Sequence, residues 1–275
     1  MRQRAISALV FVPPLLVVLC LGMPWIAIGL TALAVVGARE AFRLMDAAGH
    51  PAQPWLGIVL AGSLALVAAA PAVLADKAAL LLAVGVVLSA VGAFTQPEPR
   101  IGLTMWAATV FGSVYVGLLG FVARLGLVAP DLPVSAPLSA LGATRGWILL
   151  LILAVWAYDT GAFLVGRRWG KARFLVHISP SKTYAGLVGG MVAATVVVGV
   201  MLWALGAAPW GALLLGPVTG LAAQAGDLAE SMLKRAAGAK DSGSLVPGHG
   251  GILDRIDSFL FAAPIVTVYV VAIVR

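Results

Sequence analysis

Long apolar runs separated by short polar breaks dominate the chain from one end to the other. A helix needs about 20 largely apolar residues to cross the hydrocarbon layer of a bilayer. The breaks carry residues typical of turns and helix starts, such as Pro51, Pro54 and Pro99. The pattern therefore predicts an all-α polytopic membrane protein with nine membrane-spanning helices. Their expected ranges are about 5–22, 24–44, 55–75, 78–95, 103–124, 146–166, 184–206, 211–233 and 256–274.

The composition supports the same class of protein. Hydrophobic residues make up 61% of the chain and charged residues only 11%, with a mean hydropathy of +1.05, whereas soluble proteins carry about 25% charged residues. A single water-soluble core cannot bury so much apolar surface, and a chain this poor in charge does not stay disordered. With one cysteine, Cys20, a disulfide within the chain is excluded, and with three histidines no zinc site is expected.

The basic residues fall mostly on one side of the predicted topology. The net charge of +7 points to membrane orientation and not to a nucleic-acid partner. With the N-terminus in the cytoplasm, 14 of the 18 Lys and Arg residues face the cytoplasm, and Lys77, Arg124, Arg145 and Arg275 are the other 4. This bias predicts a protein integral to a bacterial-type cytoplasmic (inner) membrane, surrounded by membrane lipids, with its functional site facing the cytoplasm. The cytoplasmic set is Arg2, Arg4, Arg39, Arg43, Arg100, Arg167, Arg168, Lys171, Arg173, Lys182, Lys234, Arg235, Lys240 and Arg255.

The two halves of the chain differ in where their charges lie. Residues 1–145 are expected to form an N-terminal helical scaffold of about five spans. Residues 146–275 are expected to form a catalytic region of about four spans, with cytoplasmic loops at 167–183 and 234–255. The acids of the first half lie nearly all at span ends, where snorkelling and loop solvation explain them. They are Glu40, Asp46, Asp76, Glu98 and Asp131.

Two aspartates lie inside predicted spans, Asp159 in the sixth and Asp227 in the eighth. A carboxylate at membrane depth costs several kcal/mol unless it faces a cavity, a partner or a metal. At 1.5 Å per residue, Asp227 lies ~10 Å before Lys234 and Asp159 lies ~12 Å before Arg167, so both reach a similar depth. Two unrelated structural acids at one depth are the alternative. We expect instead a polar cavity, formed by the C-terminal helices and open to the cytoplasm.

The eighth predicted span carries a charged face. On a soluble helix such a face would be a solvated stripe with intrahelical ion pairs. Here the opposite face, which includes Leu228 and Met232, must meet lipid or other helices. The charged face is therefore expected to line the cavity, with its acids deep and its bases shallow. Its members, spaced i, i+3, i+4, i+7 and i+8, are Asp227, Glu230, Ser231, Lys234 and Arg235.

The segment 240–258 that follows is rich in glycines and acids. Its glycines let backbone N–H groups approach an anion closely, and the next helix is expected to begin near Asp254. Asp254 and Asp257 are three residues apart and face the same way, which helix capping alone would explain. Beside Asp227 in a second helix, these carboxylates can also share a hard cation. Mg²⁺ fits, because it is commonly held by one or two carboxylates together with water and phosphates.

Basic residues also mark the connection between the sixth and seventh spans. The Walker pattern for nucleotide binding is absent, but basic residues beside Ser, Thr and Gly still suit phosphate binding. Arg167 and Arg168 are typical of an ordinary positive-inside loop. Lys182, within the run Ser179-Pro180-Ser181-Lys182-Thr183, is expected to contact a phosphate.

A series of motifs runs through the second half of the chain: Asp159-Thr160, Ser179-Pro180-x-Lys182-Thr183, Ser231-x-Leu233-Lys234-Arg235, Lys240-Asp241 and His249-Gly250-Gly251-Ile252-x-Asp254-Arg255-Ile256-Asp257. The series resembles the signature of phosphatidate cytidylyltransferases, the CDP-diacylglycerol synthases. The resemblance covers roughly residues 155–260, and the first half is similar only in being a run of helices. Val246 stands where Leu, Ile or Phe is usual, and Ala185 stands where Glu is common.

The resemblance implies a nucleotidyltransferase that transfers CMP from CTP to phosphatidic acid in the bilayer, giving CDP-diacylglycerol and pyrophosphate for phospholipid biosynthesis. It also implies Mg²⁺ as the cofactor. The implied catalytic residues are Asp227, Asp254, Lys234 and Arg235, with Asp227 and Asp254 as metal ligands and Glu230, Asp241 and Asp257 as supporting candidates. The implied phosphate-binding residues are Ser179, Lys182, Thr183, Lys234, Arg235, Lys240, His249, Gly250, Gly251 and Arg255.

Two other classes of protein compete with this interpretation. A transporter would carry protons or ions on its intramembrane acids, but no inverted repeat is evident and the acids cluster at one face. Another membrane phosphotransferase is the second alternative. A CDP-alcohol phosphatidyltransferase lacks support because no D-G-x-x-A-R run is present. A CTP-dependent lipid kinase would release CDP instead of pyrophosphate, so product analysis separates it. Acyl-chain preference, CTP against dCTP, a second cation and a homodimer stay open.

Overall fold

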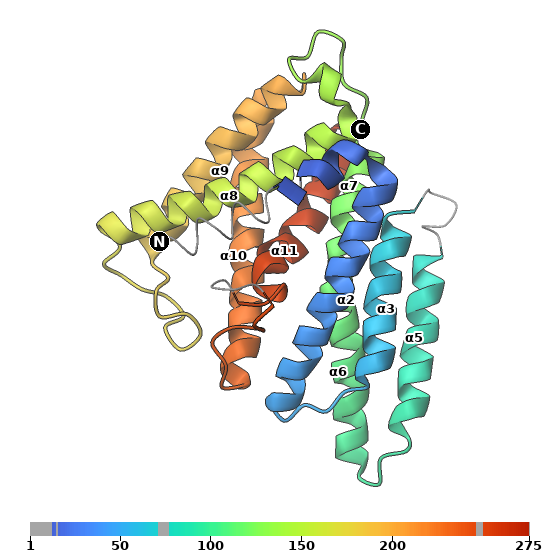
Figure 1. Ribbon diagram of the computed structural model, residues 1–275. Coiled ribbons are helices and arrows are strands. Elements are labelled where there is room, and N and C mark those ends of the chain that lie inside the picture. Colours follow the sequence, from blue (N-terminus) through green and yellow to red (C-terminus); the bar gives the residue numbers. More distant parts are fainter. Residues whose placement is uncertain (1–12, 15, 71–76, 246–249, 275) are drawn as a thin grey trace. The chain divides into compact units, whose positions relative to one another are not determined.

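The computed structural model describes residues 13–14, 16–70, 77–245 and 250–274, and these residues form helices and connections without a strand. Apart from the α-helices, η1 to η3 are short 3₁₀-helices and η4 is a π-helix. In chain order (Figure 1), the elements are α2 (Met23–Ala47), α3 (Pro54–Ala68), α5 (Ala78–Ala93), α6 (Pro99–Gly117), η1 (Leu118–Gly120), α7 (Phe121–Val128), η2 (Ser139–Leu141), α8 (Ala143–Trp169), α9 (Tyr184–Ala204), η3 (Pro209–Gly211), α10 (Ala212–Ala236), α11 (Leu253–Tyr269) and η4 (Val270–Val274).

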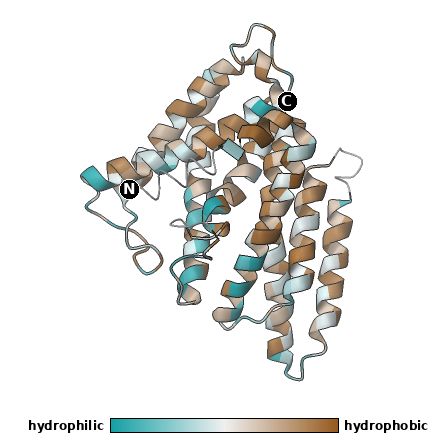
Figure 2. Ribbon diagram, viewed as in Figure 1, coloured by the Kyte–Doolittle hydropathy of each residue, from teal (hydrophilic) through white to brown (hydrophobic). Residues whose placement is uncertain are grey.

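The described helices confirm an all-helical polytopic membrane protein. Apolar residues cover most of their length, and hydrophilic residues gather mainly near helix ends and on connections (Figure 2). Two shorter apolar helices, α3 and α5, accompany six segments that are long and apolar enough to cross a bilayer. Together they overlap the last eight predicted spans, while half of the first, 5–22, lies outside the described residues. The six long segments are Met23–Ala47, Pro99–Val128, Ala143–Trp169, Tyr184–Ala204, Pro209–Ala236 and Leu253–Val274.

The chain divides into two compact units that are not two consecutive halves. The first unit comprises Met1–Ala123 and Met232–Ile256, and the second comprises Arg124–Ser231 and Asp257–Arg275. Helices α10 and α11 therefore contribute residues to both units. The division into a scaffold and a catalytic region at residue 145 was a division by function, and it stays a prediction.

Within the first unit, α2, α3, α5 and α6 lie side by side (Figure 1). Glycines allow this close packing, because a side chain at Gly57 of α3 would overlap the Phe42 ring of α2, and one at Gly85 of α5 would overlap Leu60. Small residues at such positions are what helix association in a bilayer requires, since burial from water supplies little driving force there. These contacts hold α2 in place, including the end of the helix that carries Glu40.

Within the second unit, α8 and α9 pack along one another over most of their length (Figure 1). Gly161 of α8 has no room for a side chain because Ala193 and the backbone of Gly189 lie against it. On α9, Gly190 fits against the buried Tyr158 ring in the same way. The close contact of α8 and α9 fixes the start of α9, where Lys182 and Thr183 precede the helix.

Candidate active site

The Asp254 carboxylate, near the start of α11, is surrounded by hydrogen-bond donors. Its Oδ1 lies 2.6 Å from Lys234 Nζ, near the end of α10. Its Oδ2 accepts hydrogen bonds from the backbone N–H groups of Ser242 and Gly251, at 2.9 and 2.8 Å. The ion pair is nearly buried, because the Lys234 and Asp254 side chains are 12% and 7% exposed. Since charge-assisted hydrogen bonds are about twice as strong as neutral ones, the carboxylate is held in one position.

A second carboxylate, Glu40 of α2, binds the backbone at the same helix start. Glu40 is 2% exposed. Its Oε1 accepts from the Ile252 N–H at 3.1 Å, and its Oε2 accepts from the Leu253 N–H at 2.8 Å. Such N–H groups have no partner within the helix, and the positive end of the helix dipole also favours a carboxylate. The prediction that acids of the first half are solvated at span ends is therefore wrong for Glu40.

Ser242 lies between these two carboxylates. Its Oγ is 2.9 Å from both Glu40 Oε2 and Asp254 Oδ2, and it accepts from the Asp254 N–H at 3.3 Å. A hydroxyl has one proton to donate, so the two carboxylates share it. Sequence reasoning missed both Glu40 and Ser242. Ser242 lies within the segment 240–258 and could have been included, but no local pattern connects Glu40 to a partner 202 positions further along the chain.

The two glycines before α11 are fitted closely to this network. Gly250 has a φ of 81°, in the left-handed region that favours glycine. A Cβ atom at Gly251 would meet Ser242 Oγ and Glu40 Oε2. The predicted glycine segment thus provides the Gly251 N–H that binds Asp254, and it leaves room for the Glu40 carboxylate.

The other predicted residues of this segment lie nearer the surface. Arg235 Nη1 donates to the carbonyl of Ala239 at 3.3 Å, three residues beyond the last residue of α10, Ala236. His249 and Val246 lie outside the described residues, so the predicted role of His249 stays a prediction. The exposed members of the predicted set are Arg235, Lys240, Asp241 and Arg255.

In the second unit, Lys182 and Asp227 form an ion pair through Nζ and Oδ2. Gln224 Nε2 donates to the same Asp227 oxygen at 3.4 Å, and the Tyr158 hydroxyl donates to Gln224 Oε1 at 3.0 Å. The Lys182 and Asp227 side chains are 26% and 24% exposed, more than their counterparts in the first unit. The structure thus brings together two predicted site residues that lie 45 positions apart (227 minus 182). Sequence reasoning missed Gln224, although its position three residues before Asp227 is the signal.

Thr183 and Ser179 shape the loop that carries Lys182. Thr183 is the N-cap of α9, because its Oγ1 accepts from the Gly186 N–H at 3.1 Å. The Ser179 carbonyl accepts from the Lys182 N–H at 3.3 Å, which closes a tight turn. Both residues therefore hold the loop geometry, and their predicted contact with phosphate stays a prediction.

The remaining predicted acids of the second unit differ in burial. Glu230 is fully buried on α10, Asp257 is partly buried, and Asp159 of α8 is exposed. The turn of α10 at Gly226 packs directly against α11, since a Cβ there would meet the Asp257 carbonyl oxygen. The turns that bear Asp227 and Asp257 are therefore neighbours within this unit.

Oxygen donors for a cation are available in both units. Groups of three or more His, Cys, Asp or Glu that could hold a metal are absent from the described residues. Mg²⁺ does not require such a group, because one or two carboxylates hold it together with waters and substrate phosphates. On Asp254, Oδ2 is crowded by two backbone N–H groups and a hydroxyl, and Oδ1 is paired with Lys234, so Oδ1 would hold a cation only in exchange for Lys234. The donors fit an ion of this class.

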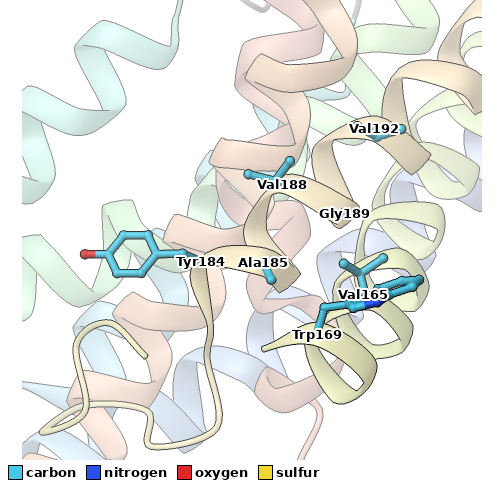
Figure 3. A pocket seen from close by; sticks show the side chains of 7 residues that line it. All are labelled: Val165, Trp169, Tyr184, Ala185, Val188, Gly189 and Val192. Carbon is cyan, nitrogen blue, oxygen red and sulfur yellow. The ribbon is translucent and has the colours of Figure 1, made fainter. Parts of the chain in front are cut away.

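An apolar groove begins directly after the Lys182 loop (Figure 3). It is formed by the end of α8 and the start of α9, and Ala185 is among its lining residues, so no acid enters it at that position. The lining residues are Val165, Trp169, Tyr184, Ala185, Val188, Gly189 and Val192.

Comparison with known proteins places these features in a family. The cytidylyltransferase family matches residues 2–273, almost the whole chain. The chain belongs to the cytidylyltransferase family. The resemblance inferred from the motifs at 159–257 is thereby confirmed, and the cytidylyltransferase motifs contain the Lys234–Asp254 ion pair and Lys182 of the Lys182–Asp227 pair.

Curated relatives of this cytidylyltransferase carry the name phosphatidate cytidylyltransferase. One from Staphylococcus saprophyticus is 43% identical over 129 residues, which are 46% of this chain and 50% of that protein. One from Synechocystis is 50% identical over 131 residues, 45% of this chain and 44% of that protein. One from Brucella suis is 44% identical over 124 residues, 44% of this chain and 46% of that protein. The chain spans about half the length of the curated relatives it matches.

Proposed function

We propose that this cytidylyltransferase is a phosphatidate cytidylyltransferase, which transfers CMP from CTP to phosphatidic acid and releases pyrophosphate. The names of its relatives support this substrate pair. The observation that carries the proposal is the nearly buried Lys234–Asp254 pair, held by the Ser242 and Gly251 backbone N–H groups inside the family motif. A lysine held beside the positive end of a helix suits a polyphosphate.

The reaction needs alignment and charge neutralisation more than a protein nucleophile. A phosphate oxygen of phosphatidic acid forms a bond to the α-phosphorus of CTP, and the bond from that phosphorus to the oxygen bridging the β-phosphate breaks. Pyrophosphate leaves with that oxygen. Because the attacking phosphate is already ionised near neutral pH, no general base is required. The protein must bring two polyanions together and stabilise the charge on the leaving group.

In our proposal, residues of the two ion pairs and of the connection before α11 divide this work. Lys182, Lys234, Arg235 and Lys240 bind phosphates, while the backbone at Gly250 and Gly251 approaches an anion. Asp227 and Asp254 are the proposed carboxylate ligands of Mg²⁺. When bound, Mg²⁺ supplies positive charge that offsets the charge on the phosphates. The supporting acids in this proposal are Glu230, Asp241 and Asp257.

The setting of the enzyme in the membrane is part of the same proposal. Nine spans, with a polar cavity of the C-terminal helices open to the cytoplasm, would place Lys182 and Lys234 within reach of CTP. The apolar groove after Lys182 has the lining that suits an acyl chain of the lipid substrate. We propose the bacterial-type cytoplasmic membrane as its location, and a homodimer stays open.

Orientation is tested by labelling single cysteines, in a background where Cys20 is replaced. Cysteines at the exposed positions Ser181 and Ser244 should resist a membrane-impermeant maleimide in intact spheroplasts and react after permeabilisation. A cysteine at Val134, which is 96% exposed and predicted to lie outside, should react in both. Labelling of Ser181→Cys or Ser244→Cys in intact spheroplasts would contradict the cytoplasmic site.

The activity is tested with the purified full chain in detergent, phosphatidic acid, Mg²⁺ and CTP labelled at either the α- or the γ-phosphorus. The α-label should enter the lipid and the γ-label should leave as pyrophosphate. A CTP-dependent lipid kinase would instead place the γ-label on the lipid and release CDP. If neither label reaches the lipid, or if Lys234→Ala is as active as the natural chain, the proposal is wrong.

A further inference from the structure

Glu40 is a buried acid in a part of the chain that otherwise consists of packed apolar helices. It lies near the end of α2, on the side of that helix that also contributes the buried Ala41 and Leu44. The proposed reaction assigns no role to it. A buried carboxylate is costly unless donors satisfy it, so its contacts identify what it does.

Among the described residues, the hydrogen-bond partners of the Glu40 side chain lie on the connection between Lys234 and Asp254. Both of its oxygens accept backbone N–H groups at the start of α11, from Ile252 and Leu253. Its Oε2 also accepts from the Ser242 hydroxyl at 2.9 Å. These partners are 202 to 213 positions away in sequence, so Glu40 joins α2 to both sides of the α10–α11 connection.

The backbone around Glu40 is shaped to receive its carboxylate. A Cβ atom built at Gly243 would lie 2.6 Å from Glu40 Oε1, and one at Gly251 would overlap Glu40 Oε2. Glycine at both positions therefore leaves space that the carboxylate fills. A shorter acid on α2 would leave this space empty and its donors without a partner.

The link from Glu40 to the ion pair is short. Ser242 Oγ lies 2.9 Å from Glu40 Oε2 and 2.9 Å from Asp254 Oδ2, and the Ser242 N–H also binds Asp254. Asp254 in turn holds Lys234 at 2.6 Å. A change at Glu40 therefore reaches Asp254 through one residue and Lys234 through two.

We propose that Glu40 is a positioning residue for the nucleotidyl transfer: it fixes the start of α11 and Ser242, and thereby sets Asp254 and Lys234 for binding the phosphates of CTP. The inference rests on the proposed function, because it assigns to Lys234 a CTP phosphate contact. Glu40 itself touches no substrate in this proposal. It is the means by which the N-terminal helices take part in the reaction.

The kinetic test uses Glu40→Gln, which keeps the size of the side chain but turns one acceptor oxygen into a donor facing a backbone N–H. We expect the KM for CTP to rise about tenfold, because Lys234 loses its fixed position. In the double variant Glu40→Gln, Lys234→Ala, the KM for CTP should be no higher than in Lys234→Ala alone. A simple loss of folded enzyme would lower the rate and leave the KM unchanged. Additive increases in KM in the double variant would overturn the proposal.

The second readout does not depend on activity. Trypsin should cleave after the exposed Lys240 several times faster in Glu40→Gln than in the natural chain, as identified by the mass of the fragments, because Ser242 two residues later is released. If the natural chain lacks activity but this difference is seen, the proposed function fails and the positioning of the connection stands. If activity is normal and the cleavage rates are equal, Glu40 does not position the connection.

A matched control lies on the same helix. Asp46→Asn removes the same charge from an exposed position of α2 and should change neither the KM for CTP nor the cleavage rate at Lys240.

If Glu40→Gln gives no folded protein, Ser242→Ala decides the question, because it removes the hydroxyl between the two carboxylates and keeps the hydrogen bonds of Glu40 to the start of α11. We expect about a threefold rise in the KM for CTP and faster cleavage, and no change in either would refute the inference.

Discussion

In each unit the described residues include a lysine–aspartate pair, and these two pairs are built differently. Asp254 is held by backbone N–H groups of Ser242 and Gly251 as well as by Lys234. Asp227 is held by the side chains of Lys182 and Gln224. The Asp254 side chain is 7% exposed and the Asp227 side chain is 24% exposed.

This difference separates two roles of an aspartate: supplying negative charge and holding the surrounding backbone in place. Asp254 is both a charge and a structural centre, because the connection before α11 folds around it. Asp227 contributes mainly charge, since α10 would keep its backbone hydrogen bonds without it. Equal losses of activity at the two positions could therefore have different causes, and structural readouts should tell them apart.

The largest effect is expected from neutralising the aspartates. Asp227→Asn and Asp254→Asn should each lower kcat/KM by several orders of magnitude, since a hard dication requires the carboxylate charge. Any residual activity should need far more Mg²⁺. The two should differ in tryptic cleavage at Lys240, which rises only in Asp254→Asn. Near-normal turnover of Asp227→Asn at ordinary Mg²⁺ would mean that other acids hold the metal.

Removing the lysines comes next in size. Lys182→Ala and Lys234→Ala should each lower kcat/KM by about 10–100-fold, because a hydrogen bond to a charged group contributes about 1.5–3 kcal/mol. Arg168→Ala is the matched control, since Arg168 lies on the same connection as Lys182 and is expected to have an ordinary loop role. A loss at Arg168 as large as at Lys182 would indicate a general electrostatic field and no defined phosphate contacts.

A smaller effect is expected from the neutral partners of Asp227. Gln224→Leu should lower kcat/KM by about threefold, because its hydrogen bond to Asp227 is long at 3.4 Å and the Lys182 pair remains. Tyr158→Phe should give a similar or smaller loss, since Tyr158 acts on Asp227 only through Gln224. A double variant that loses more than the product of the two single effects would show that Tyr158 has a separate role.

Asp159→Asn should have the smallest effect, within about twofold in kcat/KM, because Asp159 is exposed on α8 and is expected to order its surroundings without touching metal. Steady-state kinetics over a range of Mg²⁺ concentrations check this. A rise in the Mg²⁺ requirement comparable to that of Asp227→Asn would make Asp159 a metal ligand.

Much of the fold follows from the sequence because long apolar runs leave few alternatives in a bilayer. The helix starts at Pro54, Pro99 and Tyr184 lie within four residues of the predicted span starts 55, 103 and 184. The ends are less well predicted: α8 continues to Trp169 because Arg167 and Arg168 remain helical beyond the apolar run.

The site was predictable where its residues lie close together in sequence. Asp254, Lys234 and the glycines belong to one motif, and Lys182 belongs to another. Glu40 was not predictable, because apolar periodicity reports which face of α2 is buried but not that an acid on that face meets α11. A contact between residues 213 positions apart depends on tertiary packing, which local patterns do not encode.

The fit of Glu40 between two glycines also constrains how this chain can change over generations. A mutation that adds a methyl group at Gly251 meets Ser242 and Glu40, while one that shortens Glu40 leaves donors unsatisfied. Each step is harmful alone, and Gly251→Ala together with Glu40→Asp relieves only the overlap with the Glu40 carboxylate, because Ser242 Oγ still lies against the added methyl group. Positions 40, 242 and 251 are therefore expected to change together, so that a substitution neutral in one lineage is damaging in another.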